Sequence, residues 1–234
     1  MTSWMPAMHD VHVRDHIRER VLARRGKVHW FDELDPAGTA FVVIDMQQTF
    51  CEPGSPAEVP KSREIVPPIN ALTGELRKRG VPVIWVLHAN THRDGVSDWE
   101  GFFNHVVSDQ VRTRTIESLA PGRQQVWQDL EVSREDVTVI KNRYSALIPG
   151  SSSLERVLRN LGVDTILIGG TKTNVCCEST GRDAMMLDFN VVMVEDCCAA
   201  LSDDEHQATL ETFIQQFGDV LTSDEVVARL DRAG

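Results

Sequence analysis

Short, uninterrupted runs of apolar residues recur along most of the chain. The first occupies residues 40–44 and stops at Asp45. Runs of this length, without alternation of apolar and polar positions, are typical of strands buried on both faces of a sheet. Similar runs occupy residues 83–87, 137–140, 165–168 and 191–194, and a weaker one occupies residues 219–221.

Helical patterns separate these runs. Residues 65–79 and 153–160 have apolar positions at helical spacing, and Gly80 and Gly162 follow them as C-terminal caps. Strands that alternate with helices form parallel sheets through right-handed crossovers. The pattern therefore predicts an α/β protein with a three-layer α/β/α, Rossmann-like fold around a central, mostly parallel six-stranded sheet.

Three more helices are expected towards the C-terminus. They cover residues 175–187, residues 205–216 and a short segment at the end of the chain. For the last of these, Ser223 is expected to be the N-cap, with Asp224 and Glu225 in the first turn.

The N-terminal part differs from the rest in charge. Residues 10–27 contain six basic and three acidic residues, so the remainder of the chain carries a formal charge of −14. Apolar residues at helical spacing predict an amphipathic arm within this stretch. We expect the arm to pack on the body or on a second subunit, because its apolar face is short and has no aromatic anchor for a membrane surface. The spaced residues are Val13, Ile17, Val21 and Leu22.

These differences divide the chain into an arm, residues 1–36, and an α/β domain, residues 37–234. Within the domain, residues 90–134 form the least regular connection. They hold Trp99, Phe102, Phe103 and Trp127 among polar residues. Long connections in compact domains are often functional, so this one is expected to be a substrate lid or a subunit contact.

Composition narrows the classes of function. The 234 residues include 24 Lys and Arg against 35 Asp and Glu, a formal charge of −11, which repels phosphate backbones and disfavours nucleic-acid binding. No apolar run approaches the roughly 20 residues that span a bilayer, so we expect no membrane partner and a cytoplasmic protein. The five cysteines include two adjacent pairs and show no zinc-site spacing, so we expect neither a disulfide framework nor a metal site.

Chemically active residues follow three of the predicted strands. Asp45 ends the first run, Lys141 ends the third, and Cys176 lies just beyond the fourth, after Gly169 and Gly170. Ligands of open parallel sheets bind outside the carboxyl ends of the strands, so these residues should meet at one rim. Each alone has an ordinary structural reading: a turn former, a solvated strand end, and a small buried apolar residue.

Together these three residues suggest a nucleophilic thiol. A helix N-terminus and a nearby cation are expected to lower the pKa of Cys176, and a carboxylate within reach can take the thiol proton. The glycines let the backbone approach a substrate closely, and the amides that open the next helix could bind an oxyanion. No phosphate-binding glycine motif is present. His88 and His92 straddle a strand end and a loop, so helical metal spacing does not apply to them.

Three ordered motifs carry a resemblance to a known family. They are Ile44-Asp45-Met46-Gln47, the segment from Lys141 to Ser145, and the segment from Thr173 to Ala184. Over residues 40–221 the chain resembles the isochorismatase-like cysteine hydrolases. Its Lys-x-Arg-Tyr-Ser and Thr-Asn-Val-Cys-x-Glu-Ser-Thr segments are most similar to those of ureidoacrylate amidohydrolases.

The resemblance implies an Asp–Lys–Cys triad at Asp45, Lys141 and Cys176. It makes Cys176 the nucleophile and Cys177 a packing residue, and it implies a cis peptide between Thr171 and Lys172. The backbone amides of Lys172 and Cys176 would then form the oxyanion hole. The segment after Asp45 lacks the metal-binding residues of zinc nicotinamidases, so no metal and no other cofactor is expected.

The function expected from this resemblance is hydrolysis of a C–N bond in a small amide or in a ureido or carbamoyl compound. The reaction would pass through a covalent acyl-enzyme. The alternatives are an amidase acting on biuret, N-carbamoyl amino acids or maleamate, and a catalytically silent binding or assembly member of the fold. Relatives commonly form dimers or tetramers, which makes a homo-oligomer the expected assembly. Residues expected to contact the substrate are Gln47, His88, Asn90, Phe103, Tyr144 and Thr171.

Overall fold

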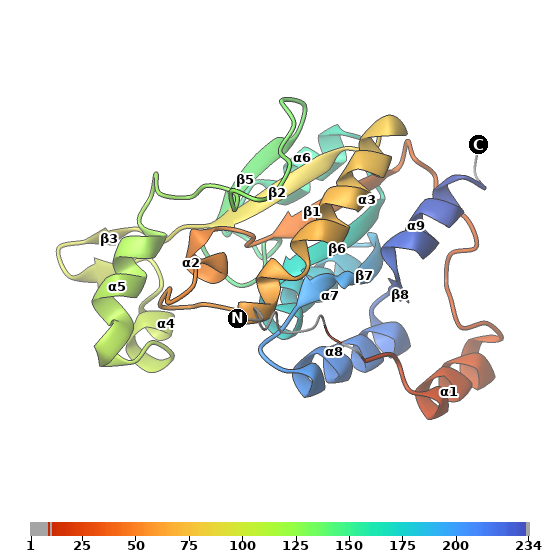
Figure 1. Ribbon diagram of the computed structural model, residues 1–234, viewed down its shortest axis with the longest axis horizontal. Coiled ribbons are helices and arrows are strands. Elements are labelled where there is room, and N and C mark those ends of the chain that lie inside the picture. The colour runs from red at the N-terminus through yellow and green to blue at the C-terminus, as the bar shows by residue number, and fades with distance from the viewer. Residues whose placement is uncertain (1–8, 10, 233–234) are drawn as a thin grey trace, which may run out of the picture.

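The computed structural model of the chain describes residue 9 and residues 11–232, and it is built around one six-stranded sheet. The strand order is β5-β2-β1-β6-β7-β8, and every pairing between neighbours is parallel (Figure 1). The prediction of a parallel sheet is therefore confirmed. The strands are β1 (Thr39–Ile44), β2 (Val83–His88), β5 (Val137–Lys141), β6 (Thr165–Thr171), β7 (Asn190–Ala199) and β8 (Asp219–Leu221).

Helices cover both faces of the sheet, as the alternating pattern predicted. Alternate residues of β1 belong to different cores: Phe41 and Val43 pack towards one face, while Ala40, Val42 and Ile44 pack towards the other. The first face is covered by α3 (Val66–Lys78) and α9 (Ser223–Leu230). The second is covered by α6 (Leu154–Asn160), α7 (Glu178–Met186) and α8 (Asp203–Gln216), which gives the three-layer α/β/α fold.

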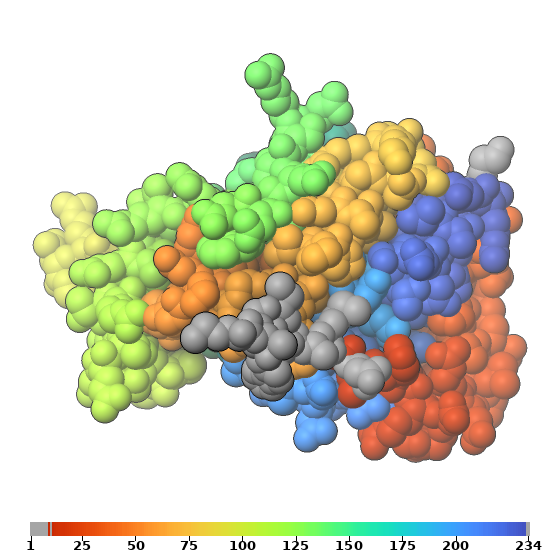
Figure 2. All heavy atoms as spheres, in the orientation of Figure 1, coloured from red at the N-terminus to blue at the C-terminus, as the bar shows by residue number. Residues whose placement is uncertain are grey.

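The connection over residues 90–134 is more regular than its sequence indicated. It contains a two-stranded hairpin and two helices, which together form one end of the molecule, coloured yellow to green in Figure 2. The polar residues that obscured the helical pattern lie on exposed faces of these helices. The elements are β3 (His92–Arg93), β4 (Val96–Ser97), α4 (Glu100–His105) and α5 (Asp109–Leu119); α2 (Gln48–Cys51) and a 3-10 turn (Pro60–Arg63) follow β1.

The N-terminal arm packs against α8 of the same chain. Its helix α1 (Asp15–Arg25) buries Ile17 and Val21 in the core that α8 also faces. The Arg14 guanidinium donates to both carboxylate oxygens of Glu211, at 2.6 and 2.5 Å. Leu22 is exposed, contrary to expectation, because the buried stripe of so short a helix is only one residue wide. The division of the chain at residue 36 stays a prediction.

The C-terminal helix begins one residue earlier than the sequence suggested. Thr222, not Ser223, is the N-cap, and its hydroxyl accepts from the Glu225 amide while the Glu225 carboxylate accepts from the Thr222 amide. Ser223 instead donates to Asp196, which ties the helix to β7.

Within the described residues, no helix has both the length and the apolar character needed to cross a bilayer.

Gly170 marks the point where the sheet passes into the loop of the expected nucleophile. It has a φ of +109°, and a Cβ there would lie 2.0 Å from the carbonyl oxygen of Ile44 on the neighbouring strand. We expect Gly170→Ala to lower the free energy of unfolding by more than about 4 kcal/mol or to prevent folding, because backbone must move to admit the methyl group. Urea denaturation and the yield of folded protein measure this loss.

Gly150 provides the matched control. It also has a positive φ, +82°, but a Cβ there meets no atom within 4 Å. Gly150→Ala should therefore cost only the conformational strain of about 1–2 kcal/mol. Similar losses for the two variants would show that crowding against Ile44 does not matter.

Candidate active site

The carboxyl ends of four adjacent strands carry the residues that the sequence singled out. Asp45 follows β1, His88 ends β2, Lys141 ends β5, and Cys176 lies in the turn after β6. His88 and Lys141 are paired across β2 and β5, while β1 and β6 pair through Ile44 and Gly170. Strand order and register therefore bring Asp45, Lys141 and Cys176 to one rim.

Lys141 joins the other two side chains. Its Nζ donates to Asp45 Oδ2 at 2.8 Å and lies 3.6 Å from the sulfur of Cys176. It also donates to the carbonyl oxygen of Arg143 at 3.0 Å. Asp45 and Lys141 are fully buried and Cys176 nearly so. The three groups form one compact, solvent-shielded unit.

The spacing of the strands explains why a lysine occupies this position. Lys141 ends β5, and β2 lies between β5 and β1. Neighbouring strands are about 4.8 Å apart, so the cation must cross roughly 9–10 Å to reach a carboxylate on β1. A lysine, with its long flexible stem, can cross that distance and still present three donors to the acceptors around it.

The resting state of Cys176 differs from the sequence expectation. Burial raises the pKa of the Cys176 thiol well above its usual value, and the charge of Asp45 raises it further, while Lys141 only partly opposes them. The expectation of a lowered pKa was wrong, because complete desolvation outweighs one cation. The thiol is therefore protonated at rest and needs a base to become a nucleophile.

Asp45 has the properties of that base. Burial raises the pKa of the Asp45 carboxyl, although Lys141 and the Cys176 thiol oppose the shift. Burial is the largest single influence on Lys141 and alone would lower its pKa, but the charges of Asp45 and Cys176 and the hydrogen bonds to both together outweigh it, and the net shift is upward. Asp45 Oδ2 binds Lys141, whereas Oδ1 has no hydrogen-bond partner among the described residues. One carboxylate oxygen is thus held and the other is available for a proton.

His88 supports the lysine and takes no part as an acid. Its Nδ1 lies 3.1 Å from Lys141 Nζ, and its Nε2 lies 2.8 Å from Asn90 Oδ1. Burial lowers the pKa of His88 well below its usual value, and the charge of Lys141 lowers it further. The ring is therefore neutral, with Nδ1 accepting from Lys141 and Nε2 donating to Asn90.

Cys176 occupies a π-helical turn (Thr173–Cys177) that leads into α7. Inside the turn the amides of Val175 and Cys177 both donate to the Lys172 carbonyl at 3.1 Å. The peptide bond between Thr171 and Lys172 is cis, as the resemblance implied. The oxyanion role of the Lys172 and Cys176 amides stays a prediction.

The other four cysteines lie in the core. Cys177 and Cys198 approach the carbonyl oxygens of Gly169 and Ile168, at 3.8 and 3.5 Å. Burial raises the pKa of Cys51 to about 11. All five cysteines are free and buried, and of them only Cys176 lines the cavity described next.

A cavity of about 450 Å³ opens above Cys176. His88 and Tyr144, both expected to contact the substrate, lie in its wall. A substantial part of the wall comes from α4, α5 and the residues between them, so the 90–134 connection shapes the site. The described residues that line the cavity are Phe50, Ser55, Pro56, Ala57, Glu58, His88, Phe102, Val106, Val107, Ser108, Val111, Thr115, Leu119, Tyr144, Lys172, Val175, Cys176 and Leu201.

The other four residues expected in the pocket lie outside its wall. Gln47 is buried and uses its side-chain amide to bind the His88 backbone, accepting at 2.7 Å and donating at 3.1 Å. Asn90 orients His88, as described above. Phe103 packs edge-on against His92 and Phe102, and the Thr171 hydroxyl donates to the Ala199 carbonyl. Gln47, Asn90 and Phe103 therefore contact residues that line the cavity, and Thr171 joins β6 to β7.

The sequence missed the apolar part of the wall. Phe102, Val106, Val107 and Val111 face the cavity, whereas the prediction chose Phe103. The short helices α4 and α5 were not recognised, so the face that each residue presents could not be derived. Leu201 was missed for the same reason, because it lies in a loop between β7 and α8.

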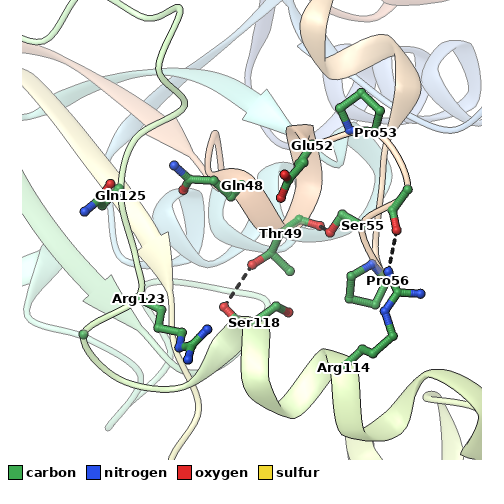
Figure 3. Close-up of a pocket in the computed structure, with 12 residues that line it drawn as sticks. Gln48, Thr49, Glu52, Pro53, Ser55, Pro56, Arg114, Ser118, Arg123 and Gln125 are labelled. Carbon is green, nitrogen blue, oxygen red and sulfur yellow. Dashed lines mark hydrogen bonds between the residues drawn. The ribbon is translucent and has the colours of Figure 1, made fainter.

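A second, polar pocket of about 620 Å³ lies beside the first (Figure 3). The two share Ser55 and Pro56 as a common wall. Across this pocket, Arg114 of α5 donates to the Gly54 carbonyl at 2.6 Å, and the Thr49 hydroxyl donates to the Ser118 carbonyl at 3.2 Å. These bonds attach α5 to the segment after β1 and fix one wall of the active-site cavity.

A histidine pair supports the nucleophile turn from the opposite side. The Thr173 hydroxyl lies 2.9 Å from His206 Nδ1, and the His206 ring stacks on His9 of the arm with centroids 4.2 Å apart. His9 Nε2 accepts from the Ala200 amide, and His9 Nδ1 binds Asp203 at 2.6 Å. The arm therefore contacts the elements that hold Cys176.

No group of three or more His, Cys, Asp or Glu side chains in the described part of the chain is arranged to hold a metal ion. The prediction that no cofactor is needed stays a prediction.

Comparison with known proteins assigns the family. The sequence model of the isochorismatase domain matches residues 39–225, and the chain belongs to this family. A solved structure of a cysteine hydrolase from Pseudomonas syringae pv. phaseolicola 1448A is 32% identical, covers 86% of this chain and 96% of its own, and superposes with a TM-score of 0.75. The protein is thus a member of the isochorismatase-like cysteine hydrolase superfamily.

Two curated relatives and one further structure complete the comparison. A "probable inactive nicotinamidase" of Arabidopsis thaliana is 33% identical over 74% of this chain and 86% of its own. The uncharacterized isochorismatase family protein YecD of Escherichia coli O157:H7 is 30% identical over 85% of this chain and 99% of its own. N-carbamoylsarcosine amidase from Thermoplasma acidophilum is 23% identical with a TM-score of 0.63, covers 80% of this chain and 96% of its own, and shares the fold.

The buried ion pair predicts a pH-dependent effect on stability. Lys141→Met leaves the Asp45 carboxylate buried without its counter-charge, which should cost about 3–5 kcal/mol at neutral pH. The unpaired Asp45 then has a still higher folded-state pKa, so the cost should shrink as the pH falls and the carboxyl becomes protonated. Urea denaturation at pH 5 and pH 8 measures the change.

The double variant Asp45→Asn with Lys141→Met is the control, since it removes both charges. It should be more stable than Lys141→Met at pH 8 and show little pH dependence from this site. Equal instability of the single and double variants would mean that lost packing, and not the unpaired charge, causes the effect.

His206 predicts a separate acid sensitivity. Burial lowers the pKa of His206 to about 3, so the unfolded chain binds a proton there between pH 6.5 and about 3 while the folded chain does not. Stability should fall with decreasing pH in this window, by up to about 1.4 kcal/mol per pH unit from this residue. His206→Gln should reduce the slope, measured by urea denaturation between pH 4 and 7. His105→Gln, at an exposed position of α4, is the control, and an unchanged slope in His206→Gln would contradict the assignment.

Proposed function

We propose that the chain is a cysteine amidohydrolase that cleaves a C–N bond in a small amide or in a ureido or carbamoyl compound. The observation that carries this proposal is the contact of Lys141 with both Asp45, at 2.8 Å, and Cys176, at 3.6 Å, where Cys176 lines an open cavity. A base, a cation and a thiol in contact are the parts that acyl transfer requires.

The first half of the reaction follows from the protonation states. The Cys176 thiol is neutral at rest, so Asp45 takes its proton as the sulfur attacks the carbonyl carbon. Lys141 stabilises the thiolate and holds the carboxylate in position. The backbone amides of Lys172 and Cys176 bind the oxyanion of the tetrahedral intermediate, and one such donor is typically worth about 3–4 kcal/mol.

The second half returns the enzyme to its starting state. Asp45, now protonated, gives its proton to the departing nitrogen and the C–N bond breaks, leaving a thioester on Cys176. Asp45 then accepts a proton from a water molecule that attacks the thioester. Collapse of this second intermediate releases the acid and restores the thiol.

Substrate identity is open within this class. The motif similarity to ureidoacrylate amidohydrolases favours a ureido compound, whereas biuret, N-carbamoyl amino acids and maleamate are the alternatives. A catalytically silent member of the family is the second candidate function, and the name of the Arabidopsis relative describes such a protein. The Asp45 carboxylate beside a thiol that lines an open cavity favours an active enzyme.

The test compares adjacent cysteines while ammonia release is measured over a panel of amides and ureido compounds. Cys176→Ala and Cys176→Ser should lower kcat by at least about 10³-fold, because no other nucleophile replaces the sulfur. Cys177→Ala should retain most of the activity, since that thiol packs in the core. Equal losses in variants that both fold would refute Cys176 as the nucleophile, and no turnover of any compound by the unaltered protein would favour the silent member.

A further inference from the structure

The two ends of the active-site cavity differ in character. At one end, His88 and Cys176 line the cavity, and behind them Lys141 is fully buried and contacts Asp45, His88 and Cys176. At the mouth, Val106 and Leu201 are 64% and 52% exposed, which is unusual for large apolar side chains that line a cavity. Phe102, Val107 and Val111 extend the apolar surface between these two ends.

The closed floor limits the size of the leaving group. If Asp45 protonates the departing nitrogen, as the proposed function requires, that nitrogen must lie next to a fully buried carboxylate. Asp45 and Lys141 are fully buried and do not line the cavity, so a nitrogen that reaches Asp45 has little room for a substituent. Ammonia is the leaving group that fits, so the substrate is a primary amide and the rest of it must extend from the acyl side towards the mouth.

The charges along the wall disfavour an anionic acyl group. No arginine lines the cavity among the described residues, and Lys172 is the one lysine in its wall. The Glu58 carboxylate also lies in the wall, where it accepts from the Gly54 amide at 2.7 Å and pairs with Arg63 at 2.9 Å. A substrate carboxylate would find one lysine and no arginine in this wall, and it would lose its hydration against apolar side chains.

We infer that the substrate is a primary amide of an apolar carboxylic acid, with Val106, Leu201 and Phe102 selecting its acyl chain. This inference rests on the proposed function and narrows it, away from ureidoacrylate and other anionic compounds. Each methylene that enters the apolar mouth should be removed from water, which favours longer chains. A volume of about 450 Å³ is within the range of cavities that hold small organic ligands.

The experiment measures kcat/KM by ammonia release for acetamide, butanamide and hexanamide, and for 5-carbamoylpentanoate, the hexanamide analogue that ends in a carboxylate. We expect kcat/KM to rise about fourfold per methylene, which is about 250-fold over the four methylenes from acetamide to hexanamide. Hexanamide should exceed 5-carbamoylpentanoate by at least tenfold. Ureidoacrylate and biuret are included in the same panel.

A matched pair of variants tests the wall itself. Val106→Asp puts a charge at the mouth and should lower the ratio of kcat/KM for hexanamide to that for acetamide at least tenfold. Val132→Asp makes the same change at a valine that is 52% exposed and does not line the cavity, so it should leave the ratio unchanged. Both positions are exposed, so both variants should fold.

The outcomes separate this inference from the proposed function. A flat dependence on chain length, or a preference for 5-carbamoylpentanoate that Lys172→Met abolishes, overturns the inference and leaves the amidohydrolase standing. Turnover of ureidoacrylate or biuret without turnover of the apolar amides also overturns the inference and leaves the amidohydrolase standing. A change of assembly size in Val106→Asp, with an unchanged substrate ratio, would show that the mouth is a subunit contact and also overturns the inference. No turnover of any compound refutes both.

Discussion

The buried pair of Asp45 and Lys141 is the constraint on which the active-site geometry depends. Two charges without solvent are costly, and they persist only where each has close partners. Lys141 Nζ has the Asp45 carboxylate at 2.8 Å, the Arg143 carbonyl at 3.0 Å and the His88 ring at 3.1 Å. All these groups come from strand ends or the residues just after them, so the register of the parallel sheet fixes their positions.

The same burial controls the chemistry of the thiol. A sulfur in solvent beside a lysine would have a lowered pKa and would react with many electrophiles. Here desolvation and the nearby carboxylate raise the pKa of Cys176. In the proposed reaction, the thiol therefore becomes a nucleophile only when Asp45 takes its proton.

The residues of the site fall into two groups. Asp45, Lys141 and Cys176 form the floor, and the other residues that line the cavity form the wall. Asp45, Lys141 and Cys176 stand on strands or on a turn whose backbone bonds are internal, and Gly170 lets that turn approach β1 closely. The wall comes largely from α4, α5 and the loop at Leu201, which lie outside the sheet. In the proposed function, Asp45, Lys141 and Cys176 set the reaction type, whereas the other residues of the cavity wall select the substrate. The family assignment therefore says more about the first than about the second.

The sequence by itself determined the sheet, its flanking helices and the set of residues at the rim. Buried strands are continuous apolar runs, and helices between them have their own period, so both are visible locally. Asp45, Lys141 and Cys176 could be chosen because each follows such a run. The roles of Gln47, Asn90 and Thr171 could not be derived, because a residue next to a strand end can face the cavity or support it from behind, and sequence position does not distinguish the two.

Only the tertiary structure decided which of two adjacent aromatic residues, Phe102 or Phe103, faces the cavity, since this depends on how α4 packs. The tertiary structure also raises the pKa of Cys176, whereas the sequence predicted a lowered pKa. That shift depends on how completely solvent is excluded from the thiol by elements far apart in the sequence, and no local pattern encodes the exclusion. Local periodicity thus fixed the elements and their order, while packing over long sequence distances fixed the shape and the electrostatics of the site.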